Sequence, residues 1–429
     1  MANLAIKGGS KLYTKQFTKW PVHGARENEL LMKVLESGKW WRFAYGEGVE
    51  LKEKTIGPDS AQVTQFQEEF AAYQQSEYCV LCANGTGALE IALKALKIGP
   101  GDEVIVPSYT YVGSATCALQ VNAVPVFADI DPDTYNLDPI KAEALINERS
   151  RAIMPVHFSG QSCDMDAFLK LGKKYNLAIV EDAAHAHGSE WNGHKVGALG
   201  DIGTFSFQAS KNMTAGEGGA ILTNNKQLAK LVDSFIWSGR EVDRPWYEFH
   251  RLGWNYRITE FQAAILRAQL ERLDEQIERR NDNYAYFENK IKEIEGFTPL
   301  KLLPGATRHS RHIIMVKYNP GIFGISRELL MDALIAEGIS IFKGYIFPLY
   351  KNPMFLNQEF YPKGCPINCH HYNKKINYAD FEATNPVAEK ACKDEALWFD
   401  QSMFLGTHED MNDIISAINK IKDNITELK

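Results

Sequence analysis

The feature that most constrains the fold is a regular alternation of short apolar segments with segments of helical period. The apolar runs begin near residues 80, 104, 124, 152 and 178. Between them, apolar residues recur at the spacing of an amphipathic helix. Strands this apolar, each followed by a helix, predict βαβ units around a mostly parallel sheet that is buried between helices.

The rest of the chain follows a different pattern. The stretch from Thr259 to Phe287 has one apolar and one charged face, which predicts a single long amphipathic helix. A strand at 313–317 and helices near 326–337 and 409–425 then predict a smaller α+β domain. We therefore expect an N-terminal segment (1–75) packed on the core, a large domain (76–270) and a small C-terminal domain (271–429).

Composition excludes several classes of protein. Of the 429 residues, 45% are apolar and 24% are charged, which is ordinary for a globular enzyme. The net charge of -7 argues against a nucleic-acid partner, because phosphate binding needs a basic face. The sequence has neither a membrane-spanning apolar run nor a secretory signal. We expect a cytoplasmic protein with no membrane association.

A glycine-rich loop follows the first apolar strand. Gly85 and Thr86 lie in Asn84-Gly85-Thr86-Gly87, directly before a helical pattern. Glycines let the backbone approach an anion, and the start of a helix attracts negative charge. The loop is therefore either an anion site or simply a tight turn.

An acidic pair ends the apolar strand at 178–182. Glu181 and Asp182 are followed by small residues and by His185 and His187. Sheets of this type bind ligands at the carboxyl ends of their strands. The pair either faces a ligand there or caps the next helix.

A lysine lies in a third loop, between Phe205-Ser206-Phe207 and the glycines at 216, 218 and 219. If Lys211 is partly desolvated, its pKa falls and its amine can form a Schiff base. An anion cradle, an acid and a buried amine together fit pyridoxal 5′-phosphate (PLP). This cofactor needs a phosphate anchor, a lysine and a carboxylate at its ring nitrogen.

The segment 365–371, CPINCHH, offers two thiols and two imidazoles. They could bind zinc, but the spacing matches no common zinc-finger pattern. We favour a loop with incidental soft side chains and predict no metal site.

Several ordered motifs resemble one enzyme family over residues 14–425. They are Asn84-Gly85-Thr86-Gly87-Ala88-Leu89, Val106-Pro107-Ser108-Tyr109-Thr110-Tyr111, Asp129-Ile130-Asp131, the run from Glu181 to Gly188, Phe205-Ser206-Phe207, Lys211, Gly216-Glu217-Gly218-Gly219 and Asn255-Tyr256-Arg257. The chain resembles the DegT/DnrJ/StrS family of PLP-dependent sugar aminotransferases. The resemblance implies the α/β architecture of PLP fold type I, with a seven-stranded, mostly parallel sheet in the large domain.

The resemblance also implies roles for individual residues. It implies that Lys211 is the Schiff-base lysine and proton shuttle and that Asp182 binds the ring nitrogen. Tyr111 is expected to stack on the ring and His185 to lie near its phenolic oxygen. The phosphate is expected to be bound by Gly85, Thr86 and Ser206, and by Asn255 from the neighbouring subunit of a homodimer. Without the family, Tyr111 could be a core aromatic residue and Ser206 an ordinary polar strand residue.

Further motifs are Gly8-Gly9, Trp20-Pro21 and Ser37-Gly38-Lys39-Trp40-Trp41-Arg42. They resemble one branch of the family, which contains keto-cyclitol aminotransferases and aminohydroxybenzoate synthases. The branch implies transfer of an amino group from glutamate or glutamine to a keto- or aldehydo-sugar, with an octulosonate-type acid sugar as another candidate acceptor. Trp41, Arg42 and Tyr345 are candidate acceptor contacts, and an insertion at about 356–380 departs from the branch. The alternative is a PLP-dependent sugar dehydratase or aromatising synthase.

Overall fold

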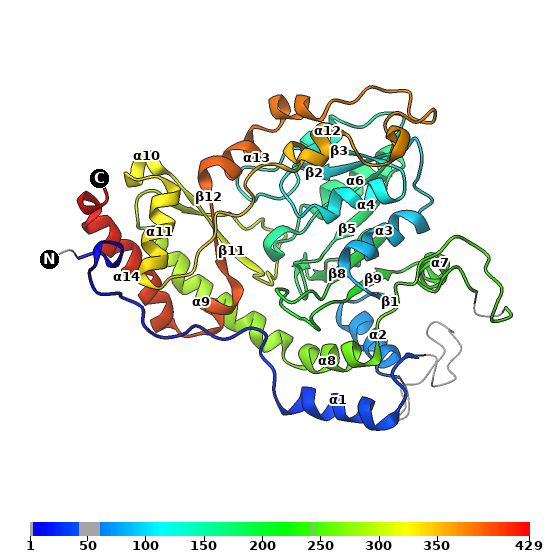
Figure 1. The fold of residues 1–429 in the computed structure, drawn as a ribbon, viewed down its shortest axis with the longest axis horizontal. Helices are drawn as coiled ribbons and strands as arrows, with labels where there is room; N and C mark the ends of the chain where they lie inside the picture. The colour runs from blue at the N-terminus through cyan, green and yellow to red at the C-terminus, as the bar shows by residue number, and fades with distance from the viewer. Residues whose placement is uncertain (1–2, 43–60, 242–243) are drawn as a thin grey trace.

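The computed structural model describes residues 3–42, 61–241 and 244–429, and its centre is a seven-stranded sheet (Figure 1). The strand order is β1-β9-β8-β5-β4-β2-β3, and within this sheet β9 alone runs antiparallel to the others. The strands are β1 (Tyr78–Cys82), β2 (Glu103–Pro107), β3 (Val124–Ala128), β4 (Ser150–Ile153), β5 (Ala178–Asp182), β8 (Ile202–Ser206) and β9 (Gly219–Thr223). The predicted seven-stranded, mostly parallel sheet is confirmed.

Helices bury both faces of this sheet, as the apolar strands predicted. On β2, Val104 and Val106 belong to one apolar cluster, and Ile105 between them belongs to another. Successive side chains of a strand point to opposite faces, so each face needs its own cover. One face is covered by α3 (Gly85–Ala95), α4 (Gly113–Gln120) and α7 (Lys226–Ile236), and the other by α2 (Gln62–Tyr73), α6 (Met165–Tyr175) and α8 (Glu260–Glu271).

A second, smaller sheet forms the other end of the molecule. Its antiparallel strands are β10 (Phe297–Pro299), β11 (Ile313–Tyr318) and β12 (Ala396–Asp400). Around a third apolar cluster, it packs with α9 (Leu273–Ile291), α11 (Arg327–Glu337) and α14 (His408–Asp423). Asn3, the first described residue, lies at this end with the C-terminus, and its backbone N–H donates to Glu427 Oε1 at 2.9 Å (Figure 1).

The single long helix predicted from Thr259 onward is wrong, because the structure has two helices that separate at Arg272. The backbone there leaves helical geometry, with φ -109° and ψ 0°. The two helices have different packing partners: α8 contacts α1 (Ala25–Ser37) and α2, whereas α9 contacts α14. The Arg272 guanidinium donates to the Val22 carbonyl and to the Glu27 carboxylate. The residue at which the two helices separate is therefore bound to the N-terminal segment.

The N-terminal segment contains helices that mixed periodicity concealed. Helix α1 begins after Gly24, which has no side chain to cap it, so no Ser, Thr, Asp or Asn marks its start. Instead, the Glu27 carboxylate accepts from the Gly24 backbone N–H at 2.9 Å. Residues 43–60 of this segment lie outside the described residues.

The connection from α11 to β12 folds back over the large sheet (Figure 1). It includes the short helices α12 (Pro353–Asn357) and α13 (Pro386–Lys390), and the insertion expected at 356–380. Phe127 of β3 packs against the rings of Tyr350, Phe355 and Tyr378. In the described part of the chain, no helix has the length and apolarity needed to cross a membrane.

Candidate active site

The carboxyl ends of β1, β2, β5 and β8 lie at one edge of the large sheet, because these strands are parallel. Most of the predicted site residues lie at this edge. Asp182 ends β5, Ser206 ends β8, Gly85 begins the helix after β1, and Tyr111 follows β2. Lys211 lies in the loop between β8 and β9. The topology therefore gathers residues that are far apart in the sequence.

Adjacent acids on β5 have opposite surroundings. Glu181 is fully buried and accepts from the backbone N–H groups of Gly197, Leu199 and Gly200, at 2.6, 2.8 and 2.6 Å. His157 Nε2 lies 2.9 Å from the same carboxylate. Glu181 thus holds the loop at 197–200 in place and is structural.

Asp182 points to the other face of the strand. Its carboxylate accepts from Ser114 Oγ at 2.7 Å and from the Ala184 backbone N–H at 3.2 Å. Burial raises the pKa of Asp182, while these hydrogen bonds and the charge of Lys211 lower it. A cation placed beside the carboxylate would therefore be strongly stabilised by it.

Lys211 has the depressed pKa that the sequence predicted. Burial lowers the pKa of its amine to about 8, and the negative charge of Asp182 partly opposes the shift. Near neutral pH, an appreciable fraction of the amine is therefore unprotonated and nucleophilic. The side chain is still partly exposed, so a ligand can reach it.

The start of α3 is pressed against the end of β8. A Cβ added at Gly85 would lie 2.7 Å from Ser206 Cβ, so a side chain at position 85 would displace the loop. Asn84 Oδ1 caps the helix by accepting from the Gly87 N–H at 2.8 Å. The first N–H groups of a helix have no acceptor within it, and its dipole favours an anion. With the Ser206 hydroxyl, this end of α3 is suited to a phosphate group.

Tyr111 lies beside this cradle, and its ring is accessible. A Cβ added at Gly113 would lie 2.8 Å from Thr86 Oγ1 and 3.1 Å from Tyr111 Cδ1, so the three residues adjoin one another. Tyr111 is 59% exposed, which excludes the alternative of a core aromatic residue. Its face can receive a flat ring.

His185 is buried beside Lys211. Its ring centroid lies 5.3 Å from that of Phe158 and 4.3 Å from that of His312. Burial and the charge of Lys211 hold the pKa of His185 well below its usual range, so the imidazole is neutral. Among the described residues, its buried Nδ1 has no hydrogen-bond partner, and a polar ligand atom could supply one.

Tyr345 joins the same edge from the connection after α11. Its ring makes edge contacts with Tyr109 and Trp398, at centroid distances of 5.2 and 5.1 Å. A Cβ at Gly344 would lie 2.5 Å from Trp398 Cε2, so glycine lets the backbone approach the indole. Burial raises the pKa of Tyr345, and the negative charge of Asp182 raises it further.

Trp41, Arg42 and Asn255 lie elsewhere. They line a pocket of about 290 Å³ together with Trp237 and Arg257. Among the described residues that line it, none belongs to the group around Lys211. The structure therefore divides the predicted site residues into two groups, one at the strand ends and one in this pocket.

Arg42 has a structural partner within the pocket. Its Nη1 lies 3.2 Å from Asp233 Oδ1 on α7, and both side chains are largely buried. Arg42, a candidate acceptor contact, is thus already paired with a carboxylate of the protein itself.

Sequence reasoning missed several residues of the Lys211 group. Ser114 bonds Asp182, and His312 contacts His185 while its Nδ1 lies 3.2 Å from Asn212 Oδ1. Trp398 and Tyr109 position Tyr345, and Trp398 Nε1 donates to the Tyr109 hydroxyl at 3.2 Å. Spacing along the chain could not reveal them, because His312 directly precedes β11 and Trp398 lies on β12, far along the chain from Lys211.

Comparison with known proteins gives a consistent result over the whole chain. The DegT/DnrJ/EryC1/StrS aminotransferase family matches residues 50–386. The L-glutamine:scyllo-inosose aminotransferase of Streptomyces griseus is 35% identical over 438 residues, covering 100% of this chain and 99% of the relative.

A second relative has a different name. The 3-amino-5-hydroxybenzoate synthase of Amycolatopsis mediterranei is 38% identical over 354 residues, covering 82% of this chain and 85% of the relative. The crystal structure of a 3-amino-5-hydroxybenzoic acid synthase superposes with a TM-score of 0.82 at 32% identity, covering 96% of this chain and 99% of that one.

Proposed function

Because the chain belongs to the DegT/DnrJ/EryC1/StrS aminotransferase family, we propose that it transfers the amino group of L-glutamine to a keto-cyclitol. The donor and acceptor follow from full-length relatives named L-glutamine:scyllo-inosose and L-glutamine:2-deoxy-scyllo-inosose aminotransferase. The observation that carries the proposal is the Lys211 amine, whose pKa burial lowers, in electrostatic interaction with the buried Asp182 carboxylate.

The residues at the strand ends fit PLP. The start of α3 with Ser206 suits its phosphate, the exposed face of Tyr111 suits its ring, and Asp182 suits its ring nitrogen. The buried Nδ1 of His185 lacks a partner among the described residues, which suits a polar substituent of the ring. When bound, PLP supplies an aldehyde that captures amines and a ring that withdraws electrons.

Lys211 has two tasks in this proposal. Its depressed pKa makes the amine available to hold the cofactor covalently. The same amine, when not bonded to the cofactor, would accept a proton at Nζ from the carbon that bears the donor's amino group and would release that proton again. In the second half of the cycle, the same amine moves the proton in the opposite direction.

Asp182 keeps the ring nitrogen protonated, so the ring can withdraw electrons while the proton moves. Ser114 Oγ and the Ala184 N–H orient the carboxylate and favour its ionised form. Tyr345, which is fixed by Tyr109 and Trp398, is proposed to contact the acceptor.

The second group of residues is proposed to complete the site of another subunit. Asn255 is exposed and lies in a pocket separate from the Lys211 group. In a homodimer, Asn255 of one copy would reach the phosphate end of the other, so each active site would contain residues from both chains.

A two-stage assay tests the function. L-Glutamine added to the PLP-loaded protein should abolish the pyridoxal absorption, and scyllo-inosose or 2-deoxy-scyllo-inosose should restore it and yield an aminocyclitol in the mass spectrum. The Lys211→Ala variant is the control. If glutamine leaves the absorption unchanged, or if no keto-cyclitol restores it, the proposed donor or acceptor is wrong.

A second candidate is an aromatising synthase that uses the same cofactor. It is favoured by the 38% identity to 3-amino-5-hydroxybenzoate synthase. Transamination releases one 2-oxo acid per acceptor consumed, whereas elimination of water consumes the acceptor without that release. Measuring the 2-oxo acid against the consumed acceptor decides between them.

A further inference from the structure

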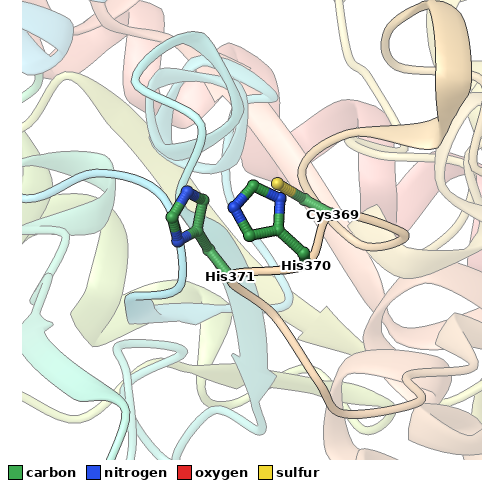
Figure 2. A group of neighbouring side chains, drawn as sticks. All are labelled: Cys369, His370 and His371. Carbon is green, nitrogen blue, oxygen red and sulfur yellow. The ribbon is translucent and has the colours of Figure 1, made fainter.

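A cluster of soft side chains lies in the insertion, outside the site described above. Within the part of the chain that the structure describes, the possible ligand atoms of Cys369, His370 and His371 all lie within 4.8 Å of one another (Figure 2). The two imidazole rings have centroids 3.8 Å apart and planes at 41°. Figure 2 shows the Cys369 thiol beside the His370 ring.

A second thiol lies in the same segment. Cys365 and Cys369 are both free cysteines, and interaction with Cys369 raises the pKa of the Cys365 thiol. Cys365 lies outside the group of three whose ligand atoms are all within 4.8 Å of one another. Thiolate sulfur and imidazole nitrogen are the usual ligands of structural zinc.

The segment is held in this shape by its neighbours. Ile367 and Tyr372 are buried in the apolar cluster of the large sheet, and the Tyr372 N–H donates to the Cys369 carbonyl at 2.9 Å. Arg149 Nη1 donates to the His371 carbonyl at 3.1 Å. Because the backbone is already ordered, a metal ion would not have to fold the loop around itself.

We propose that the Cys365–His371 segment binds one Zn²⁺ ion through its two thiols and two imidazoles. In a tetrahedral site, such ligand atoms lie roughly 3.3–3.8 Å apart, which follows from bond lengths near 2.0–2.3 Å. The ligand atoms of Cys369, His370 and His371 already lie within 4.8 Å of one another, so side-chain rotations can bring these three to that spacing. Cys365 supplies the fourth ligand by turning its thiol toward them. Two thiol protons leave to solvent as the zinc–sulfur bonds form, and no oxidation or reduction is involved.

Zinc-finger spacing did not predict this site, because a finger brings its ligands together from a hairpin and a helix. Here one tight turn does so, with the Asn368 N–H donating to the Gly364 carbonyl at 2.8 Å. Cys369 and His370 also line an open groove of about 740 Å³, so the ion can enter from solvent. The expectation of an incidental loop is revised accordingly.

The position of the site makes it structural rather than catalytic. Tyr372 donates to Glu103, the first residue of β2, at 2.8 Å. The segment therefore lies at the amino end of β2, whereas Lys211 and Asp182 lie at the carboxyl edge of the sheet. A bound ion would fasten the insertion to the large sheet without contacting substrate.

The test uses the full-length, PLP-loaded protein under a non-thiol reductant, after chelation and buffer exchange. Zn²⁺ added in a calorimeter should saturate at one ion per chain and raise Tm. Co²⁺ should give visible bands of a tetrahedral thiolate site, at longer wavelength than pyridoxal absorption. Both signals should be lost in Cys369→Ser and in His370→Gln.

The matched control is His194→Gln, which removes another exposed imidazole, on β7 (His194–Lys195), far along the chain from the insertion. It should bind Zn²⁺ as the wild type does. The proposal is overturned if the wild type binds no stoichiometric Zn²⁺, or if Cys369→Ser and His370→Gln bind it as well as the control does. It is also overturned if protein purified without reductant contains no zinc and has Cys365 joined to Cys369 by a disulfide.

Discussion

The residues around Lys211 and those around Asn255 differ in how far they are buried. Asp182 and His185 are buried, and the strand ends fix them. Asn255 is exposed and is accompanied by exposed aromatic rings, among them Trp41 at 40% and Trp246 at 45%. The first group is organised by the fold of a single chain. The second has the character of a surface that another protein covers, which is why we propose that a second copy completes it.

The largest effect should come from the first group. Lys211→Ala removes both the covalent link and the proton carrier, and loss of acid–base catalysis alone costs roughly 10²–10⁴ in rate. We expect kcat to fall by at least this factor, as measured by 2-oxo acid release, with the circular dichroism spectrum unchanged. Lys230→Ala, an exposed lysine on α7, is the matched control. Substantial turnover by the Lys211→Ala variant would mean that the residues around Lys211 are not the catalytic group.

Mixing two inactive variants tests whether the groups belong to one site. Lys211→Ala and Asn255→Ala homodimers should each be impaired. After joint refolding or co-expression, mixed dimers should contain one intact site, and about a quarter of wild-type activity should return, because half of the dimers are mixed. Activity no higher than the average of the two separate variants would mean that both groups serve the same subunit or that Asn255 is not needed.

Substitution of Arg42 tests whether this arginine binds substrate or only stabilises the pocket through its ion pair with Asp233. Asp233 is buried, burial raises its pKa, and Arg42 is the first of the groups that oppose this rise. Removing the arginine leaves a buried carboxylate without its partner, which costs roughly 3 kcal/mol or more. We expect Arg42→Ala to lower Tm, and Arg42→Met with Asp233→Leu to recover most of the loss. An unchanged Tm with a raised KM for the acceptor would instead make Arg42 a substrate ligand.

The smallest effect is a shift in pH dependence. Cofactor-free protein should take up PLP covalently at a rate that rises with pH around a midpoint near 8, because the unprotonated amine of Lys211 reacts. The negative charge of Asp182 raises this pKa, so Asp182→Asn should move the midpoint to lower pH. Asp380→Asn, at an exposed position of the insertion, should leave it unchanged. A midpoint that rises in Asp182→Asn would contradict the proposed proximity of the two groups.

The sequence predicted the large sheet and the Lys211 group well, because both depend on local pattern. Apolar strands and the loops that follow them are continuous in the chain, and parallel strands must bring their carboxyl ends together. Asp182, Gly85 and Lys211 each lie in such a loop or at such an end. Their placement follows from topology alone.

The parts that could not be predicted depend on contacts between distant segments. The break at Arg272 reflects two packing partners that helical periodicity does not encode. His312, directly before β11, contacts His185, and Asp233 pairs with Arg42 from α7. Helix α1 was missed because its start carries a glycine. In each case the deciding partner is distant in the sequence or lacks a side chain.

The neighbouring acids of β5 carry a consequence for variation of this protein. Three backbone N–H groups donate to the Glu181 carboxylate and so fix the register of β5. Because side chains alternate between the two faces of a strand, the same hydrogen bonds also fix the direction in which Asp182 points. A register shift of one residue in β5 would move Glu181 to the face that Asp182 now occupies and Asp182 to the other face. Changes at Gly197 or Gly200, whose backbone N–H groups bind Glu181, should therefore lower activity by turning the Asp182 carboxylate on the opposite face of the strand.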